Sequence, residues 1–165
     1  MRLTTEEDEG VLERQLGRTP RAFAGVSVRC PHGRPAVIAQ HSYLDSGEPF
    51  PTTYYLTCPA AVAAVGALES GGGVARFEQL VANDPELLES YRRGQELQRR
   101  LRRPGLRMAD DGRSLTLGIG GTARDGAVKC LHAHAAFALA HPGYELGGRI
   151  LDEAAPLFPE ECCSP

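Results

Sequence analysis

The pattern of hydrophobic and polar positions divides this chain into an early part with strands and a later part with helices. Three short segments have strand character, at residues 22–30, 35–40 and 52–57. The third crowds β-branched and aromatic residues together, which strands prefer. The residues between the first two segments, PHGR, have turn composition and predict a hairpin. We therefore expect a small antiparallel sheet near the N-terminus.

Helical patterns both precede and follow the predicted strands. Near the N-terminus, Thr4 and Glu7 have the spacing of a capping box, and apolar residues follow at helical intervals. Later, Pro59 directly after Cys58 is a helix-start signal, because proline lacks the N–H that would be unpaired at that position. The patterns predict helices over residues 5–16, 59–70, 74–83, 84–103 and 127–141, and one or two helical turns within residues 150–165.

These elements indicate an α+β fold in a single domain, with a small N-terminal sheet followed by helices. A chain of 165 residues is long enough to bury one substantial core. We assign residues 1–20 to an N-terminal helical extension, residues 21–158 to the domain and residues 159–165 to a flexible tail. Residues 103–114 have the composition of a loop.

Composition and charge narrow the functional classes. Hydrophobic residues make up 42% of the chain and charged residues 24%, as in an ordinary globular domain and unlike a disordered chain. The net charge of −3 gives no overall basic signature of nucleic-acid binding. The sequence has no apolar run of membrane-spanning length and no signal-peptide pattern, so we expect a cytoplasmic protein without membrane association.

Cysteine is the residue type that most narrows the functional classes of this chain. The chain has five cysteines, and thiols stay reduced in the cytoplasm, so metal binding, catalysis or burial fit better than disulfides. Cys30 and Cys58 are each followed by proline, which turns the chain away and commonly borders iron–sulfur ligands. As the expected cap of a helix, Cys58 lies near the positive end of the helix dipole, which favours the thiolate.

Cys130 lies within the predicted helix over residues 127–141, close to two histidines. Cys130 and His134 are at i and i+4 and would share a helix face, whereas His132 would point roughly the other way. Both histidines can join Cys130 at one metal only if Cys130 is the helix cap. Backbone N–H groups of the glycine-rich segment before Cys130 can face an anion or a cluster sulfide. The predicted cofactor-binding residues are Gly118, Gly120, Gly121 and Lys129.

Three separated blocks, RCPHGRPAVI, PFPTTYYLTCP and GIGG followed by VKCLHAHAA, carry a family resemblance. Together they resemble a bacterial, mainly actinobacterial family, the domain of unknown function numbered five hundred and one. The resemblance covers Phe23 to His141. The matching residues are Cys30, Pro31, Phe50, Pro51, Thr52, Cys58, Pro59, Gly118, Gly120, Gly121, Lys129, Cys130 and His132. In that family the gene commonly lies near those for enolase and a septum-formation initiator protein. This neighbourhood implies a partner in cell division or envelope growth. The resemblance implies no established activity.

Two hypotheses place chemistry on these residues. In the first, Cys30, Cys58 and Cys130 form a metal site for zinc or a [4Fe–4S] cluster. The fourth ligand is then His132, or else one of His32, His134, Cys162 and Cys163. In the second, Cys58 or Cys130 is the nucleophile of a metal-free enzyme, with a histidine as base and the glycine-rich turn as oxyanion donor.

A third hypothesis is a non-catalytic partner protein that docks through the basic helix over residues 91–103. The hypotheses differ in a geometric expectation. Three sulfur atoms that converge on one point favour a metal. One cysteine within hydrogen-bond reach of a histidine, with the other cysteines remote, favours a nucleophile.

Overall fold

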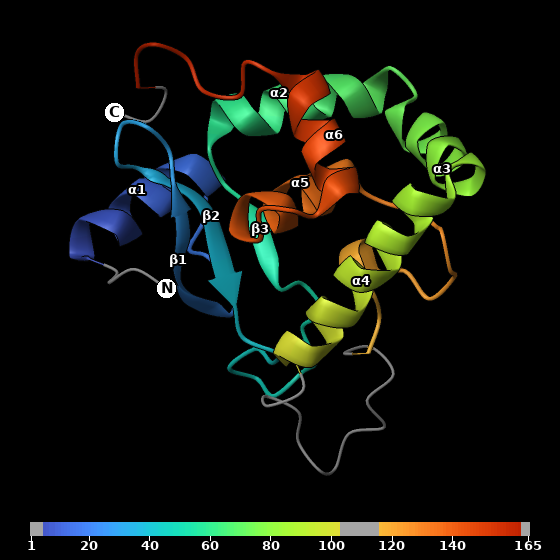
Figure 1. Ribbon diagram of the computed structural model, residues 1–165. Helices are drawn as coiled ribbons and strands as arrows, with labels where there is room; N and C mark the ends of the chain where they lie inside the picture. The colour runs from blue at the N-terminus through green and yellow to red at the C-terminus, as the bar shows by residue number, and fades with distance from the viewer. Residues whose placement is uncertain (1–4, 103–115, 163–165) are drawn as a thin grey trace.

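The computed structural model describes residues 5–102 and 116–162, and these residues form one α+β domain. A three-stranded antiparallel sheet lies near the N-terminus, and five of the six described α-helices follow it along the chain. Figure 1 shows helix α5 at the centre of the molecule, between the sheet and helix α4, with helix α2 across one end. The predicted fold class is confirmed.

The sheet has the strand order β1-β2-β3, with β1 at Phe23–Arg29, β2 at Pro35–Gln40 and β3 at Tyr54–Leu56. Both neighbouring pairs are antiparallel, and Ile38 lies opposite Tyr55 in the second pair. The predicted hairpin and third strand are therefore confirmed. The third strand is shorter than predicted because its first two predicted residues lie in the preceding loop.

Helix α1 spans Glu6–Leu16, and its N-terminus differs by one residue from the predicted capping box. The reciprocal hydrogen bonds of the box join Thr5 and Asp8, whereas the predicted pair was Thr4 and Glu7, of which Thr4 lies outside the described residues. Both pairs have a carboxylate three positions after a threonine, so the sequence pattern alone does not distinguish them. The difference frees Glu7 for a contact with the hairpin.

The two arginines that flank Cys30 bind carboxylates of α1. Arg29 donates two hydrogen bonds to Asp8, at 2.6 and 2.8 Å. Arg34 forms an ion pair with Glu7. These pairs join α1 to the turn between β1 and β2. The guanidinium groups of both arginines therefore attach α1 to the hairpin.

Helix α2 spans Pro59–Ser70, with Cys58 as its N-cap residue, as predicted. Helix α3 spans Gly73–Asn83 and helix α4 spans Pro85–Arg102, close to their predicted limits. None of the helices in residues 5–102 and 116–162 is both long and apolar enough to cross a membrane.

Helix α5 spans Leu131–Ala140, and it begins later than the predicted start at Ala127. Cys130 is the N-cap residue and has an extended backbone, with φ −151° and ψ 114°. The predicted helical face shared by Cys130 and His134 is therefore wrong. The first amide of α5 donates to the carboxylate of Glu69 on α2 at 2.6 Å, and this contact between distant segments fixes where the helix begins.

Helix α6 spans Glu145–Ala154 and is longer than the one or two turns predicted from residue 150 onward. Its two adjacent glycines are poor helix formers, which hides the helix in the sequence. The structure gives one of them a packing role. A Cβ atom on Gly147 would lie 2.4 Å from the Cβ of Ala138 and 2.7 Å from the carbonyl oxygen of His134. Only glycine lets α6 approach α5 so closely.

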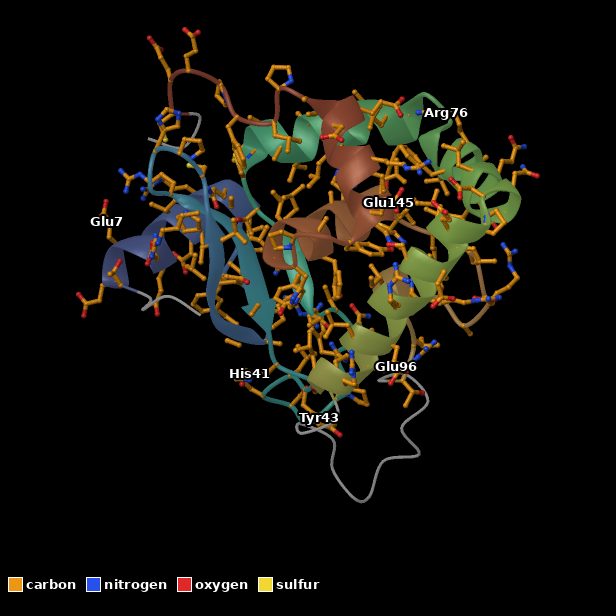
Figure 2. All side chains as sticks on the ribbon, viewed as in Figure 1. Glu7, His41, Tyr43, Arg76, Glu96 and Glu145 are labelled. Carbon is orange, nitrogen blue, oxygen red and sulfur yellow. The ribbon has the colours of Figure 1, made fainter. Side chains whose placement is uncertain are left out.

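The core is built around α5, and Figure 2 shows side chains filling the space between the sheet and the surrounding helices. The buried residues of α5 are Leu131, His134, Ala135, Ala136, Phe137 and Ala138. The Nδ1 atom of His134 is 2.7 Å from the hydroxyl of Tyr144. Burial lowers the pKa of His134 to about 3, so this histidine is a neutral core residue.

The chain after α6 lies against the hairpin turn. The Nε2–H group of His32 donates to the carbonyl oxygen of Pro159 at 3.0 Å, because a carbonyl can only accept. The side chain of Cys162 is exposed and lies near Arg34. Cys163 and the predicted loop over residues 103–114 lie outside the described residues.

Candidate functional site

The sulfur of Cys130, a ring nitrogen of His132 and a carboxylate oxygen of Glu69 lie within 4.8 Å of one another. In the described part of the chain, no other group brings together three or more such side chains of Cys, His, Asp or Glu. Glu69 comes from the end of α2, and the other two residues come from the beginning of α5. Two residues singled out in the sequence thus meet a third that was not.

The extended cap conformation of Cys130 makes His132 its neighbour. Since Cys130 lies outside the helix, the spacing rule that favoured His134 does not apply to it. The ring of His132 lies against α2 at Gly66, where a Cβ atom would be 3.8 Å from Nε2. The Nε2 atom is 3.0 Å from the carbonyl oxygen of Val62, so Nε2 carries a proton and donates it to that carbonyl.

The two carboxylate oxygens of Glu69 have different contacts. Oε1 accepts the N–H of Leu131, the first residue of α5, at 2.6 Å. Oε2 is 3.3 Å from Nδ1 of His132. The carboxylate therefore caps the positive end of α5 and also fixes the orientation of the imidazole.

The surroundings of His132 favour its charged form. Its pKa is raised from 6.5 to about 9, with the hydrogen bond to the side chain of Cys130 as the largest cause. Burial acts in the opposite direction, while the carbonyl of Val62 and the charge of Glu69 raise the pKa further. At neutral pH, His132 is therefore an imidazolium that lies beside the side chain of Cys130.

Cys130 and His132 line a pocket of about 560 Å³. This volume is within the range of small-molecule sites. The polar residues of the wall are Thr52, Thr53, Gln98, Lys129, Cys130 and His132, together with two tyrosines, and the rest is mainly apolar. Glu69 is not part of the wall, so it acts on the pocket through His132.

The pocket contains three of the four predicted cofactor-binding residues: Gly120, Gly121 and Lys129. Gly118 lies behind the wall, where a Cβ atom would come within 1.9 Å of Oε1 of Gln95. The N–H of Gly121 donates to the carbonyl of Gly118 at 2.9 Å, and the amide after Gly118 donates to Gln95 at 2.5 Å. Most amides of this turn, which includes the short helix η2 at residues 119–121, are therefore used within the protein.

The first turn of α5 supplies other donors. The backbone N–H groups of His132 and Ala133 form no hydrogen bond with any described residue. Both residues line the pocket. The beginning of a helix has such unpaired N–H groups by construction, and they favour a partial negative charge nearby.

Cys30 and Cys58 are outside the group formed by Cys130, His132 and Glu69. Both cysteines are buried among the apolar side chains of the core. Cys58 caps the beginning of α2 whereas Glu69 is at its end, which separates them by roughly 16 Å along the helix axis. The structure therefore does not gather the three cysteines in one group.

Of the other predicted ligands that the structure describes, His32 and Cys162 are near the hairpin turn and His134 is in the core. The helix predicted as a docking surface is the second half of α4. Tyr91 and Arg102 are buried there, so that helix presents only part of its surface to solvent.

Sequence reasoning missed Glu69. It is the one acidic residue in the sequence PAAVAAVGALES, and it stands near the C-terminal end of that helix. An acidic side chain is unfavourable at this end of a helix dipole. That conflict was the available signal that Glu69 has a partner outside α2.

Comparison with known proteins gives the family of the chain. Neither the curated proteins nor the solved structures contain a match. A family model described as "Protein of unknown function (DUF501)" matches residues 26–153. This span contains all three residues of the group around Cys130, and it confirms the resemblance seen in the sequence. The chain therefore belongs to the DUF501 family of proteins of unknown function.

Proposed function

We propose that this protein is a cysteine-dependent enzyme that transfers or hydrolyses an acyl group. Cys130 is the nucleophile, His132 is the acid and base, and Glu69 is a positioning residue. The observation that carries the proposal is that the sulfur of Cys130, a ring nitrogen of His132 and a carboxylate oxygen of Glu69 lie within 4.8 Å of one another. A nucleophile, a base and a group that orients the base are the usual parts of such a centre.

The proposed reaction has two halves. The thiolate of Cys130 attacks the carbonyl carbon of an acyl donor, and a sulfur–carbon bond forms. The bond to the leaving group then breaks, and the leaving group takes a proton from His132, which becomes neutral. In the second half, His132 takes a proton from water or another acceptor as that group attacks the thioester, and the thiolate is released.

Two features of the site support this chemistry. The Nε2–H of His132 is held by the carbonyl of Val62, so Nδ1, which also lies 3.3 Å from Oε2 of Glu69, is the nitrogen that exchanges the proton. The open amides of His132 and Ala133 are donors for the negative charge that develops on the carbonyl oxygen.

The test is reaction of the purified protein with p-nitrophenyl acetate. We expect release of p-nitrophenolate and an acetyl adduct on Cys130, located by mass spectrometry. Cys130→Ser is expected to abolish the adduct, and His132→Asn to lower the acylation rate by about 100-fold. Cys162→Ser is the matched control, because it removes an exposed cysteine outside the pocket.

The proposal fails if Cys130 reacts no faster than Cys162. It also fails if His132→Asn forms the acetyl adduct on Cys130 at the wild-type rate. Treatment with a chelator is expected to leave the acylation rate unchanged, because the proposed chemistry uses no metal.

A second candidate, a zinc site, is favoured by the same hydrogen bond to Val62. Metal-binding histidines commonly donate their other N–H to a backbone carbonyl, as His132 does here. Cys130, His132 and Glu69 would then be three protein ligands, with a fourth position toward the pocket. A [4Fe–4S] cluster takes four thiolates, whereas this group offers one sulfur, so zinc suits the donor set better.

Elemental analysis of protein purified without chelator tests the second candidate. One zinc per chain is expected under that candidate, and Cys130→Ser and Glu69→Gln should each lose it. Cys58→Ser is the control and should retain the metal. Protein with no zinc and an intact acylation rate would reject the zinc site and support the enzyme.

A further inference from the structure

The proposed chemistry leaves most of the pocket unexplained, because Cys130 and His132 account for a small part of its wall. The apolar part of the wall comes from several elements and surrounds the space beside α5. Its aliphatic residues and phenylalanine are Leu56, Val62, Leu117, Ile119, Ala133 and Phe137. A site with this lining binds an apolar group in preference to a polar one.

The wall runs along one side of α5. Cys130, Ala133 and Phe137 are spaced by three and four residues, which places the last two on one helix face with Cys130 at its beginning. At the helical rise, Cys130 and Phe137 are about 10 Å apart along the axis. The pocket therefore extends from the thiol past a small side chain to an aromatic ring.

Two positions beside the thiol are nearly free of side-chain atoms. Ala133 has a single methyl group, and Gly120 faces it from the turn that includes η2. A Cβ atom on Gly120 would lie 3.6 Å from the Cβ of Cys130 and 3.8 Å from the Cβ of Ala133. The positive φ of 72° at Gly120 also favours glycine there. Both positions keep the space next to Cys130 open.

The far end of this path is closed by aromatic rings. Phe137 is buried and meets Tyr54 edge to face, with ring centroids 5.8 Å apart. Tyr144, the residue that caps the beginning of α6, packs edge to face against the same ring, with centroids 5.4 Å apart. An apolar chain that enters beside Cys130 would therefore end at Phe137.

From these contacts we infer the substrate class: an acyl donor whose apolar chain lies along α5, with its carbonyl at Cys130 and its end at Phe137. Ala133 is the residue that determines the width of the path. This inference rests on the proposed acyl-transfer function, because that function places the carbonyl at Cys130. The chain that fits is up to about 10 Å long.

The test is the acylation rate with p-nitrophenyl esters of acetate, butyrate, hexanoate and octanoate. Each buried methylene favours transfer from water by roughly fourfold, so we expect kcat/KM to rise at least tenfold from acetate to the best longer ester. Ala133→Leu is expected to remove this rise, because its larger side chain fills the path beside Cys130. Ala67→Leu is the matched control, because Ala67 is an exposed helical alanine outside the pocket.

Thermal unfolding of Ala133→Leu shows whether that variant is folded, and Ala133→Met, with a more flexible side chain, is the second variant. Equal rates for all four esters, or an unchanged chain-length profile in both variants, would overturn the inference and leave the enzyme proposal standing.

A binding measurement tests the apolar site independently of the enzyme proposal. Calorimetric titration of Cys130→Ser with octanoate needs no nucleophile, and binding that Ala133→Leu removes in this background supports the apolar path. If no ester acylates the wild-type protein while octanoate still binds, the enzyme proposal fails and the apolar site stands. If octanoate does not bind and no ester length is preferred, the apolar site is rejected.

Discussion

At the scale of single residues, the centre of this protein depends on Cys130 being the cap of α5 and not a member of it. The extended backbone of that residue brings its side chain to His132, and Glu69 holds the same ring from α2. Helical periodicity had paired Cys130 with His134, which instead lies in the core beside Tyr144. A difference in the first residue of one helix therefore changes which histidine is chemically relevant.

The charge of His132 leads to a prediction about pH. Its pKa of about 9 is above the ordinary 6.5, so protonation stabilises the folded state. That contribution is complete below pH 6.5 and is lost as the pH rises through 9. An NMR titration of the ring resonances should show His132 losing its proton near pH 9.

Cys130→Ser is expected to lower the pKa of His132, because it weakens the hydrogen bond that is the largest cause of the shift. The resonance assigned to His132 should be absent in His132→Asn. An unchanged titration in Cys130→Ser would contradict the pairing of these two side chains.

At the scale of elements, helix ends and helix contacts are set by groups distant in the sequence. The first amide of α5 is satisfied by Glu69 of α2, and α6 reaches α5 through a glycine. Neither contact can be recognised from the sequence of its own helix. The beginning of α5 and the length of α6 were accordingly the elements predicted least well.

Replacement of Glu69 tests the link between α2 and α5. Glu69→Ala removes the acceptor for the first amide of α5 and should destabilise the protein by about 1 kcal/mol. Glu69→Gln keeps an oxygen acceptor there and should cost less. Urea unfolding of the two variants measures the difference, and equal losses would argue against a capping role.

The two glycines of α6 give a matched pair. In Gly147→Ala the new Cβ meets Ala138 at 2.4 Å, and we expect a loss of about 2 kcal/mol or more from overpacking. Gly148 has open space at the same position, so Gly148→Ala should stabilise the helix by up to about 1 kcal/mol. Thermal unfolding of both variants checks the sign of each effect, and a stabilised Gly147→Ala would disprove the close contact.

At the scale of the whole molecule, α5 is the element on which the sheet, α2 and α6 pack. It meets β3 on one side and α2 and α6 on others, as Figure 1 shows. The pocket lies on this same helix, so the core and the candidate site share one support. Helix α1 belongs to the same fold, because Val11 and Leu12 are buried and Asp8 binds Arg29.

The packing of α1 can be tested against the expectation that residues 1–20 are an extension. Leu12 is fully buried, so Leu12→Ala should lower the free energy of unfolding by about 2–5 kcal/mol. Leu80→Ala is the control because Leu80 is 38% exposed, and its effect should be below about 1 kcal/mol. Similar small losses in urea unfolding for both variants would mean that α1 is dispensable for the core.

The sequence by itself determined the elements whose signals are local. Strand propensity placed β2, the proline after Cys58 placed the start of α2, and turn composition placed the hairpin. The sequence also singled out Cys130 and His132, since cysteine and histidine are uncommon and chemically distinctive. These features depend on backbone preferences and residue types that act within a few positions.

The tertiary structure decided which of these residues meet. It joined Cys130 and His132 to Glu69, left Cys30 and Cys58 outside that group, and opened a pocket along α5. The physical reason is that hydrogen bonding between distant segments and close packing fix helix ends and side-chain directions, and both depend on where the rest of the chain lies. A carboxylate 62 positions away from the amide it caps has no signature in the local sequence of that helix.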